Sequence, residues 1–271
     1  MPGASLAGLR VLTLRSARPD DPLTETLQLA GATVANYPVL NIEGLDVSPE
    51  TIVKLRPSEV GASTLLPYDT LVFVSRHAVF HGLESLRRAG IDFTKVRVVA
   101  VGPTTGAMLR SSGIESIYPI EQASTESVLA MPEMQTVQGQ RILIVRGQSG
   151  RETLKQELLE RGAEVRYCEV YRRIVDYRHA DAIRKFLDNH QSTAVVVHSG
   201  EIVSAYAGLL TSMRSDHFKL QPVLDLPCIT PGVRVADIAS ELGFTEVISA
   251  SSALASDIEQ ALRCWYTRQP H

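Results

Sequence analysis

Six short segments of this chain carry the residue types that bind anions, namely glycine, serine, threonine and arginine. Backbone N–H groups in tight turns, hydroxyls and guanidinium groups all donate hydrogen bonds to carboxylates and phosphates. Any one such segment is more simply explained as a helix cap or a turn. Six of them together favour a binding site for an anionic ligand. The segments are Arg15–Pro22, Ser75–His77, Gly102–Thr105, Arg146–Arg151, Ser199–Glu201 and Pro231–Arg234.

Other motifs that carry chemistry are weak or missing. No G-x-G-x-x-G follows the first apolar run and no G-x-x-x-x-G-K-[ST] occurs, which disfavours dinucleotide and P-loop nucleotide binding. His77 and His81 have the spacing of two zinc ligands on a helix, but no third ligand is evident, so we predict no metal. His198 and Ser199 are neighbours at an expected strand end and point to opposite faces, which argues against hydrolase chemistry.

An internal repeat indicates the elements that position these loops. Residues 8–41 resemble residues 139–172 at a constant offset of 131, with ten identities in 34 ungapped positions. One identity pairs Arg15 with Arg146, directly after the first apolar run of each copy. Each copy reads as a buried strand, a polar turn, an amphipathic helix, a Gly-Ala break and a second strand.

The rest of the chain repeats in the same way. Residues 68–79 parallel residues 192–203, and residues 99–114 parallel residues 228–244. Short β-rich runs alternate with helical patterns throughout, which is typical of parallel sheets with helices on both faces. The sequence therefore predicts an α/β fold with two doubly wound parallel sheets.

Length and composition agree with two globular domains. The chain has 271 residues, of which 44% are hydrophobic and 21% are charged. A net charge of −3 argues against a nucleic-acid partner. No apolar run is long enough to cross a membrane, and Met1–Ser5 does not resemble a signal peptide. Three scattered cysteines favour a reducing compartment, so we expect a cytoplasmic protein.

The residues alone leave the domain boundary open. A tandem division would cut near Met134–Gly139, but that segment has little linker character. A long irregular stretch at Asn41–Pro67 is the other candidate.

Several of these segments resemble the uroporphyrinogen-III synthase family. The most specific pieces are RGQSGRETLKQELLERGAEV followed by VYRR, and the VGPTT turn. The resemblance runs from about Gly8 to Leu262, in the family's order and spacing. It implies two flavodoxin-like domains joined by a two-stranded linker that the chain crosses twice. The implied division is 1–38 with 174–271 for domain one, 44–166 for domain two, and 39–43 and 167–173 for the linker strands.

The resemblance also implies the reaction. The substrate would be hydroxymethylbilane, a linear tetrapyrrole with eight carboxylates, which loses water and closes to uroporphyrinogen III with its last ring inverted. Loss of the hydroxyl needs a proton donor, and the reactive cation that forms must be held in one conformation. No cofactor is expected.

The implied catalytic residue is Tyr171, just past the expected strand Val165–Val170 and beside the Arg172-Arg173 pair. The family's hydroxyl residues match Thr105 and Ser75, with Ser199 as the counterpart of Ser75. Together with the six loops this gives a predicted substrate-binding set of Arg15, Ser75, Arg76, His77, Gly102, Thr104, Thr105, Arg146, Ser199, Gly200, Gly232 and Arg234.

One position departs from the family. Gly232 is followed by Val233, Arg234 and Val235, where many members have G-P-T-T. Val235 has no hydroxyl, so we expect the threonine contact to be missing there, with Arg234 as a substitute carboxylate ligand.

A second function remains an alternative: a non-catalytic regulatory protein of the same fold that binds a tetrapyrrole or another anion. Members of that kind usually carry an appended DNA-binding region, and this chain stops at His271, where the last expected helix ends. For the enzyme we expect a monomer with hydroxymethylbilane as its small-molecule partner and at most a transient contact with the preceding enzyme of the pathway. Neither nucleic acid nor membrane is expected as a partner.

Overall fold

The computed structural model describes residues 5–16, 21–47, 68–188, 192–215 and 218–268. It divides into two compact units, one made of residues 1–41 and 174–271 and the other of residues 42–173. Most of the irregular stretch expected at Asn41–Pro67 lies outside the described residues. No helix within the described ranges is long and apolar enough to span a bilayer.

Unit 1 is built on a parallel five-stranded sheet with the order β10-β9-β8-β1-β2. Its strands are β1 (Arg10–Thr13), β2 (Thr33–Asn36), β8 (Thr193–Val196), β9 (Cys228–Thr230) and β10 (Val247–Ser249). Its helices are α1 (Pro22–Leu29), the 3₁₀ turn η1 (Tyr177–His179), α8 (Ala180–Leu187), α9 (Gly200–Met213), α10 (Gln221–Leu224), α11 (Val233–Glu241) and α12 (Ala255–Tyr266).

Unit 2 contains the second sheet, with the order β3-β7-β6-β4-β5. Its strands are β3 (Leu40–Gly44), β4 (Thr70–Phe73), β5 (Arg97–Ala100), β6 (Arg141–Gly147) and β7 (Glu164–Val175). Its helices are α3 (Arg76–Arg88), α4 (Pro103–Ser111), α5 (Thr125–Ala130), α6 (Pro132–Gln135) and α7 (Thr153–Glu160). The mixed α/β fold with parallel sheets predicted from the sequence is confirmed.

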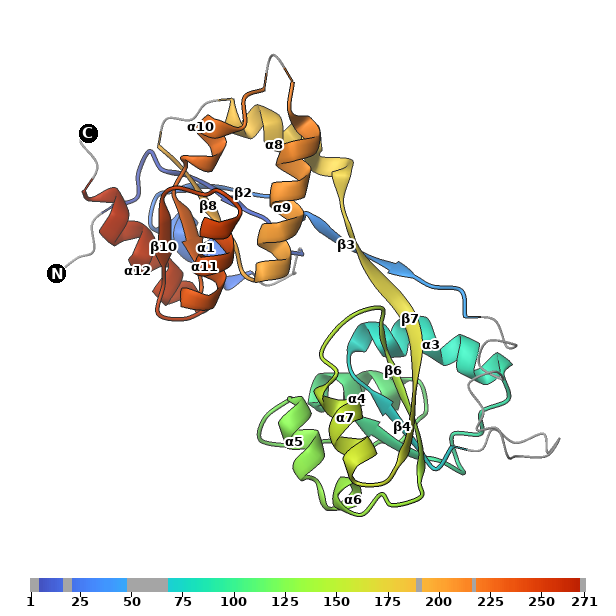
Figure 1. The fold of residues 1–271 in the computed structure, drawn as a ribbon. Coiled ribbons are helices and arrows are strands. Elements are labelled where there is room, and N and C mark those ends of the chain that lie inside the picture. Colours follow the sequence, from blue (N-terminus) through green and yellow to red (C-terminus); the bar gives the residue numbers. More distant parts are fainter. Residues whose placement is uncertain (1–4, 17–20, 48–67, 189–191, 216–217, 269–271) are drawn as a thin grey trace. The chain divides into compact units, whose positions relative to one another are not determined.

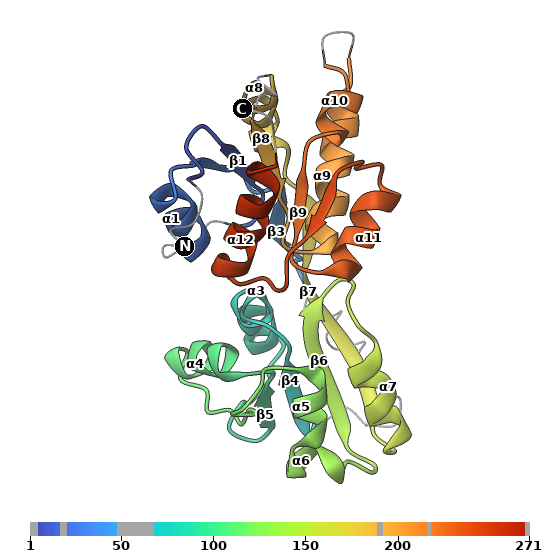
Figure 2. The same cartoon turned by 90° about the vertical axis from the view of Figure 1, so that its left-hand side faces the viewer.

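Each sheet is buried on both faces because its strands are apolar at consecutive positions. In unit 1, Leu12 and Val195 pack with α9, while their neighbours Val11 and Ala194 pack with α1 and α12. Unit 2 repeats this arrangement, with α3 and α4 on one face and α5, α6 and α7 on the other (Figure 2).

The chain passes between the units in β3 and again in β7, which are paired with each other (Figure 1). The backbone N–H of Leu45 donates to Val170 O, and that of Asp176 donates to Val39 O. Residue numbers rise along one strand as they fall along the other, so this pair is antiparallel.

The apolar pattern predicts a strand that ends at Val170 with Tyr171 just past it, and this was wrong because β7 continues to Val175. The linker strand implied at 167–173 lies within β7. Arg172 and Arg173 interrupt the apolar pattern, which is why the sequence did not indicate a longer strand. Both side chains are exposed in the part of β7 that pairs with β3. A β-bulge also interrupts the pairing of β7 with β6, because Arg146 faces Glu169 whereas Gly147 faces Tyr171. The bulge allows the consecutive side chains of Val170 and Tyr171 both to be buried.

Candidate active site

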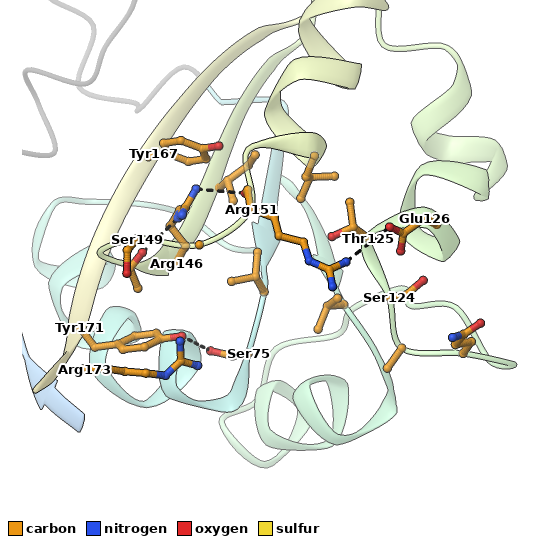
Figure 3. A pocket seen from close by; sticks show the side chains of 18 residues that line it. Ser75, Ser124, Thr125, Glu126, Arg146, Ser149, Arg151, Tyr167, Tyr171 and Arg173 are labelled. Atoms are coloured by element: carbon orange, nitrogen blue, oxygen red, sulfur yellow. Dashed lines mark hydrogen bonds and ion pairs between the residues drawn. The ribbon is translucent and has the colours of Figure 1, made fainter. Parts of the chain in front are cut away.

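The carboxyl edge of the unit 2 sheet holds a cavity of about 610 Å³ (Figure 3). Ligands of parallel α/β sheets bind at this edge, where loops meet helix N-termini. Three arginines and one glutamate contribute to the wall, which gives it a positive balance suited to anions. The polar residues that line it are Ser75, Gln122, Ser124, Thr125, Glu126, Arg146, Ser149, Arg151, Tyr167, Tyr171 and Arg173.

Tyr171 lies at one side of this cavity with its hydroxyl 3.1 Å from Ser75 Oγ. The tyrosine is 4% exposed, and its ring lies against Gly147, where a methyl group would approach Cε2 to 2.5 Å. Ser75 is the N-cap of α3, and its Oγ accepts a hydrogen bond from Ala78 N–H at 3.0 Å. A buried ring and a helix cap thus fix both hydroxyls.

An arginine and two histidines lie near the tyrosine. Arg173 stands two residues further along β7, and its side chain extends in the same direction as that of Tyr171 (Figure 3). The rings of His77 and His81 lie 5.7 and 6.1 Å from the Tyr171 ring. Partial desolvation of the ring, followed by the charges of His81, Arg76 and Arg173, lowers the pKa of His77. Burial likewise lowers the pKa of His81, so both imidazoles favour the neutral form.

Arg146, at the end of β6, is 4% exposed and also lines the cavity. Its Nη1 donates to Glu152 Oε1 at 3.0 Å, and its guanidinium lies 4.3 Å from the centre of the Tyr167 ring. The Tyr167 hydroxyl donates to the other oxygen of Glu152 at 2.9 Å. These hydrogen bonds lower the pKa of Glu152, so it is a carboxylate at neutral pH.

A comparison of the sequence with models of known protein families shows the family of this chain. The model of the family described as uroporphyrinogen-III synthase HemD matches residues 21–258. The chain belongs to this family. The resemblance identified in the sequence is therefore confirmed.

Two similar proteins of known name align with this chain over their full length. The uroporphyrinogen-III synthase of Salmonella typhimurium is 29% identical over 259 residues, which covers 94% of this chain and 100% of the relative. The enzyme of the same name from Escherichia coli is 28% identical over 258 residues, with the same coverage.

Solved structures support the fold. A mutant uroporphyrinogen III synthase from Thermus thermophilus has a TM-score of 0.55 and 17% identity, covering 97% of this chain and 100% of that one. The enzyme from Helicobacter pylori also has a TM-score of 0.55, at 14% identity, with 96% and 100% covered.

The remaining predicted residues of unit 2 lie at the same sheet edge but do not line the cavity. Arg76 and His77 open α3 and are exposed. Gly102 is the N-cap of α4, where a methyl group would lie 2.3 Å from Cβ of the lining residue Ala123. Thr104 is exposed on α4, and Thr105 is 4% exposed.

In unit 1 the predicted residues occupy the corresponding sheet edge, after β1, β8 and β9. Ser199 caps α9 through a hydrogen bond from Ile202 N–H at 3.3 Å, and Gly200 leaves room for Ile238. Gly232 is the N-cap of α11, and Arg234 is exposed on that helix. Val235 is 5% exposed and packs in the core of unit 1. At this position a valine completes the core.

Arg15 repeats the contact of Arg146. It forms an ion pair with Asp21, the N-cap of α1, and Glu152 is the N-cap of α7 at the same offset of 131 residues. Both copies of the repeat thus carry an arginine at the strand end and an acid at the helix start. The tyrosine that stacks on Arg146 has no counterpart in unit 1, because Asn36 occupies the position in the repeat that corresponds to Tyr167.

Several lining residues were missed from the sequence. Ser149 and Arg151 belong to a segment that the sequence did single out, and Arg173 belongs to the arginine pair beside Tyr171. Ser124, Thr125 and Glu126 gave only the signal of a helix start, with Ser124 capping α5. The contact of Arg151 with Glu126, at 3.7 Å, joins these two loops across the cavity (Figure 3).

Proposed function

We propose that this protein is a uroporphyrinogen-III synthase, which converts hydroxymethylbilane to uroporphyrinogen III and water. The observation that carries the proposal is the family match over residues 21–258, together with full-length relatives of that name. The hydroxyl leaves with a donated proton as water, and the cation that remains forms a C–C bond to the substituted α-carbon of the last pyrrole, which gives a spiro intermediate. The bond from that α-carbon to the neighbouring methylene carbon then breaks, and the methylene carbon bonds to the other α-carbon, which loses its proton. Water is lost by C–O cleavage, so the step is a hydro-lyase reaction, and it requires no redox cofactor because hydroxymethylbilane and the products have the same oxidation level.

Tyr171 is the proton donor in this proposal. The Oγ of Ser75 accepts from Ala78 N–H and has its own proton left to donate to the Tyr171 oxygen. The tyrosine O–H is then free to donate a hydrogen bond to the departing hydroxyl of the substrate. Proton transfer to the leaving oxygen lowers the barrier to C–O cleavage.

In this proposal arginines bind the substrate carboxylates, and Tyr171 donates to the leaving oxygen. Arg146, Arg151 and Arg173 line the cavity, and guanidinium groups match carboxylates in geometry and charge. The rest of the predicted binding set, including Thr105 in unit 2 and Arg15, Ser199 and Arg234 in unit 1, belongs to the same proposal. Holding several carboxylates favours one conformation of the cation, which cyclises without inversion when free in solution.

Both units are proposed to be flavodoxin-like domains. Numbered within unit 1, its strands have the order 2-1-3-4-5, as in flavodoxins. In unit 2 the same order results when β6 is counted first, because β7, β6, β4 and β5 are followed by a bridge between Val99 and Ile117. We also propose that the enzyme acts in the cytoplasm as a monomer.

The test is to incubate the purified chain with hydroxymethylbilane, without added metal or nucleotide, and to separate the isomers after oxidation to porphyrins. We expect mainly the type III isomer. Accumulation of type I alone, at the spontaneous rate, would refute the proposal, and tight binding without turnover would favour the regulatory alternative.

A further inference from the structure

Arg146 is buried, yet one nitrogen of its guanidinium group is left without an acceptor in the described part of the chain. Its Nε donates to Gly147 O at 3.0 Å, and its Nη1 donates to Glu152 and to Arg151 O. Among the described residues none accepts a hydrogen bond from Nη2. The side chain is 5% exposed and belongs to the cavity wall, so a bound ligand is the partner that this nitrogen can gain.

The loop beside Nη2 leaves this nitrogen uncovered. At Gly150 a methyl group would lie 2.8 Å from Nη2, closer than carbon and nitrogen approach without a bond between them. The φ angle of Gly150 is +137°, a region that side chains other than glycine rarely adopt. Glycine at 150 therefore keeps the free edge of the guanidinium accessible from the cavity.

Glu152 fixes the orientation of the guanidinium group. Although it is the N-cap of α7, its side chain makes no capping hydrogen bond. Its two oxygens instead accept from Arg146 and Tyr167, and the Tyr167 ring lies against the guanidinium. The Glu152 carboxylate therefore binds Arg146 and does not cap the N-terminus of α7.

We propose that Glu152 is a positioning residue, which holds Arg146 so that Nη2 binds one carboxylate of the tetrapyrrole in the unit 2 cavity. This inference rests on the function proposed above and adds to it the residue that organises one carboxylate subsite. Charge-assisted hydrogen bonds from a fixed guanidinium are strong because little conformational freedom is lost when the ligand binds.

The competing interpretation is that Glu152 only neutralises Arg146. Two substitutions separate the interpretations. Glu152→Gln keeps an oxygen for Arg146 and a polar partner for Tyr167 but removes the charge, whereas Glu152→Ala removes both. Positioning predicts weaker ligand binding in the alanine variant and near-normal binding in the glutamine variant. Neutralisation predicts tighter binding in both, because a competing carboxylate is gone.

The measurement is fluorescence titration of the full chain with uroporphyrin III, an octacarboxylate, alongside KM and kcat with hydroxymethylbilane. We expect Glu152→Ala to raise Kd and KM about tenfold with kcat within about twofold, and Glu152→Gln to keep Kd and KM within about threefold of the unmodified protein.

In an Arg146→Gln background, Glu152→Ala should not raise Kd further, because its effect on binding acts through Arg146. Tyr167→Phe keeps the ring and removes one hydrogen bond of Glu152, so a rise of about threefold is expected even if the alanine variant folds poorly.

Glu157→Ala is the matched control. Glu157 lies on the same helix, pairs with Arg161 at 3.8 Å and does not line the cavity. Its Kd should equal that of the unmodified protein. Tighter binding by both Glu152 variants, or additive losses in the double variant, would overturn the positioning role.

Failure of the proposed function gives a different result. If the unmodified protein binds uroporphyrin III but forms no type III isomer, the enzyme proposal fails and the carboxylate subsite is still tested by Kd. If it does not bind uroporphyrin III, the subsite is overturned as well. If the unmodified protein is active and Glu152→Ala has the same Kd and KM, only the positioning role fails.

Discussion

The hydroxyl of Tyr171 lies 3.1 Å from Ser75 Oγ, although the two residues are 96 positions apart in the sequence. They come from β7 and from the start of α3, after β4, and β6 lies between these two strands in the sheet. The contact joins Tyr171, the candidate general acid, to the Ser75 hydroxyl, whose position is fixed by its role as the N-cap of α3.

Replacing Tyr171 by phenylalanine should lower kcat about 10- to 100-fold. General-acid assistance is worth about 10²–10⁴ in rate, and water can supply part of it in an open cavity. KM should change little because the carboxylates are bound by other groups. Steady-state kinetics with isomer analysis measures both. Full turnover with an unchanged isomer ratio would return Tyr171 to a packing role.

Ser75→Ala should reduce both stability and activity. Loss of an N-cap costs about 1 kcal/mol in free energy of unfolding, and Ser199→Ala should cost a similar amount because Ser199 caps α9 in the same way. Leu40 occupies the place of Tyr171 in the repeat, so Ser199 has no equivalent tyrosine partner. Chemical denaturation and kcat should therefore show equal losses of stability and a larger loss of kcat for Ser75→Ala. Equal kcat values would contradict a role for the Tyr171 contact.

Gly147→Ala should displace the Tyr171 ring. The new methyl group would lie 2.5 Å from Cε2, and overpacking of a buried site costs about 1–3 kcal/mol. The predicted result is a lower midpoint of thermal unfolding together with a loss of kcat. Gly208→Ala on α9 is the control, since no atom lies within 4 Å of a methyl group there, and it should stabilise the helix by up to about 1 kcal/mol. Unchanged kcat in Gly147→Ala would show that the ring position is not critical.

His77 should titrate below its ordinary pKa of 6.5. Partial desolvation of the ring and the charges of His81, Arg76 and Arg173 disfavour its protonated form in the folded state. The unfolded chain therefore binds more protons, so His77 makes stability fall as the pH drops below about 6.5. NMR titration of the ring should give a midpoint below 6.5 that rises in Arg173→Gln, and His77→Gln should weaken the acid dependence of stability. A midpoint at or above 6.5 would contradict this account.

The division into units predicts which fragments fold. Residues 42–173 contain all of β4–β6, nearly all of β7 and the five helices that the structure describes around them, so this fragment should show a cooperative thermal transition. Residues 1–133 lack β6 and β7, and with them the centre of the sheet in unit 2. Circular dichroism should show no cooperative transition for that second fragment. The reverse result would favour a tandem division near residue 134.

Much of the local structure and the family could be predicted from the sequence. Apolar runs after Gly8 and Gly139 indicated β1 and β6, and the amphipathic pattern that follows each run indicated α1 and α7. These signals are local, because a strand buried on both faces and a helix buried on one face leave distinct periodicities in the chain. The segments that resemble the synthase family also lie within continuous stretches of sequence.

Only the tertiary structure decided which side chains share the cavity. The bulge that turns Tyr171 toward Gly147, the reach of the Tyr171 hydroxyl to Ser75, and the placement of Ser124–Glu126 opposite Arg151 depend on strand order and register. The sequence does not show these relationships, because they join residues from segments that are far apart in the chain. The apolar pattern could not extend β7 past Val170 either, since pairing with β3 supports its exposed, charged end.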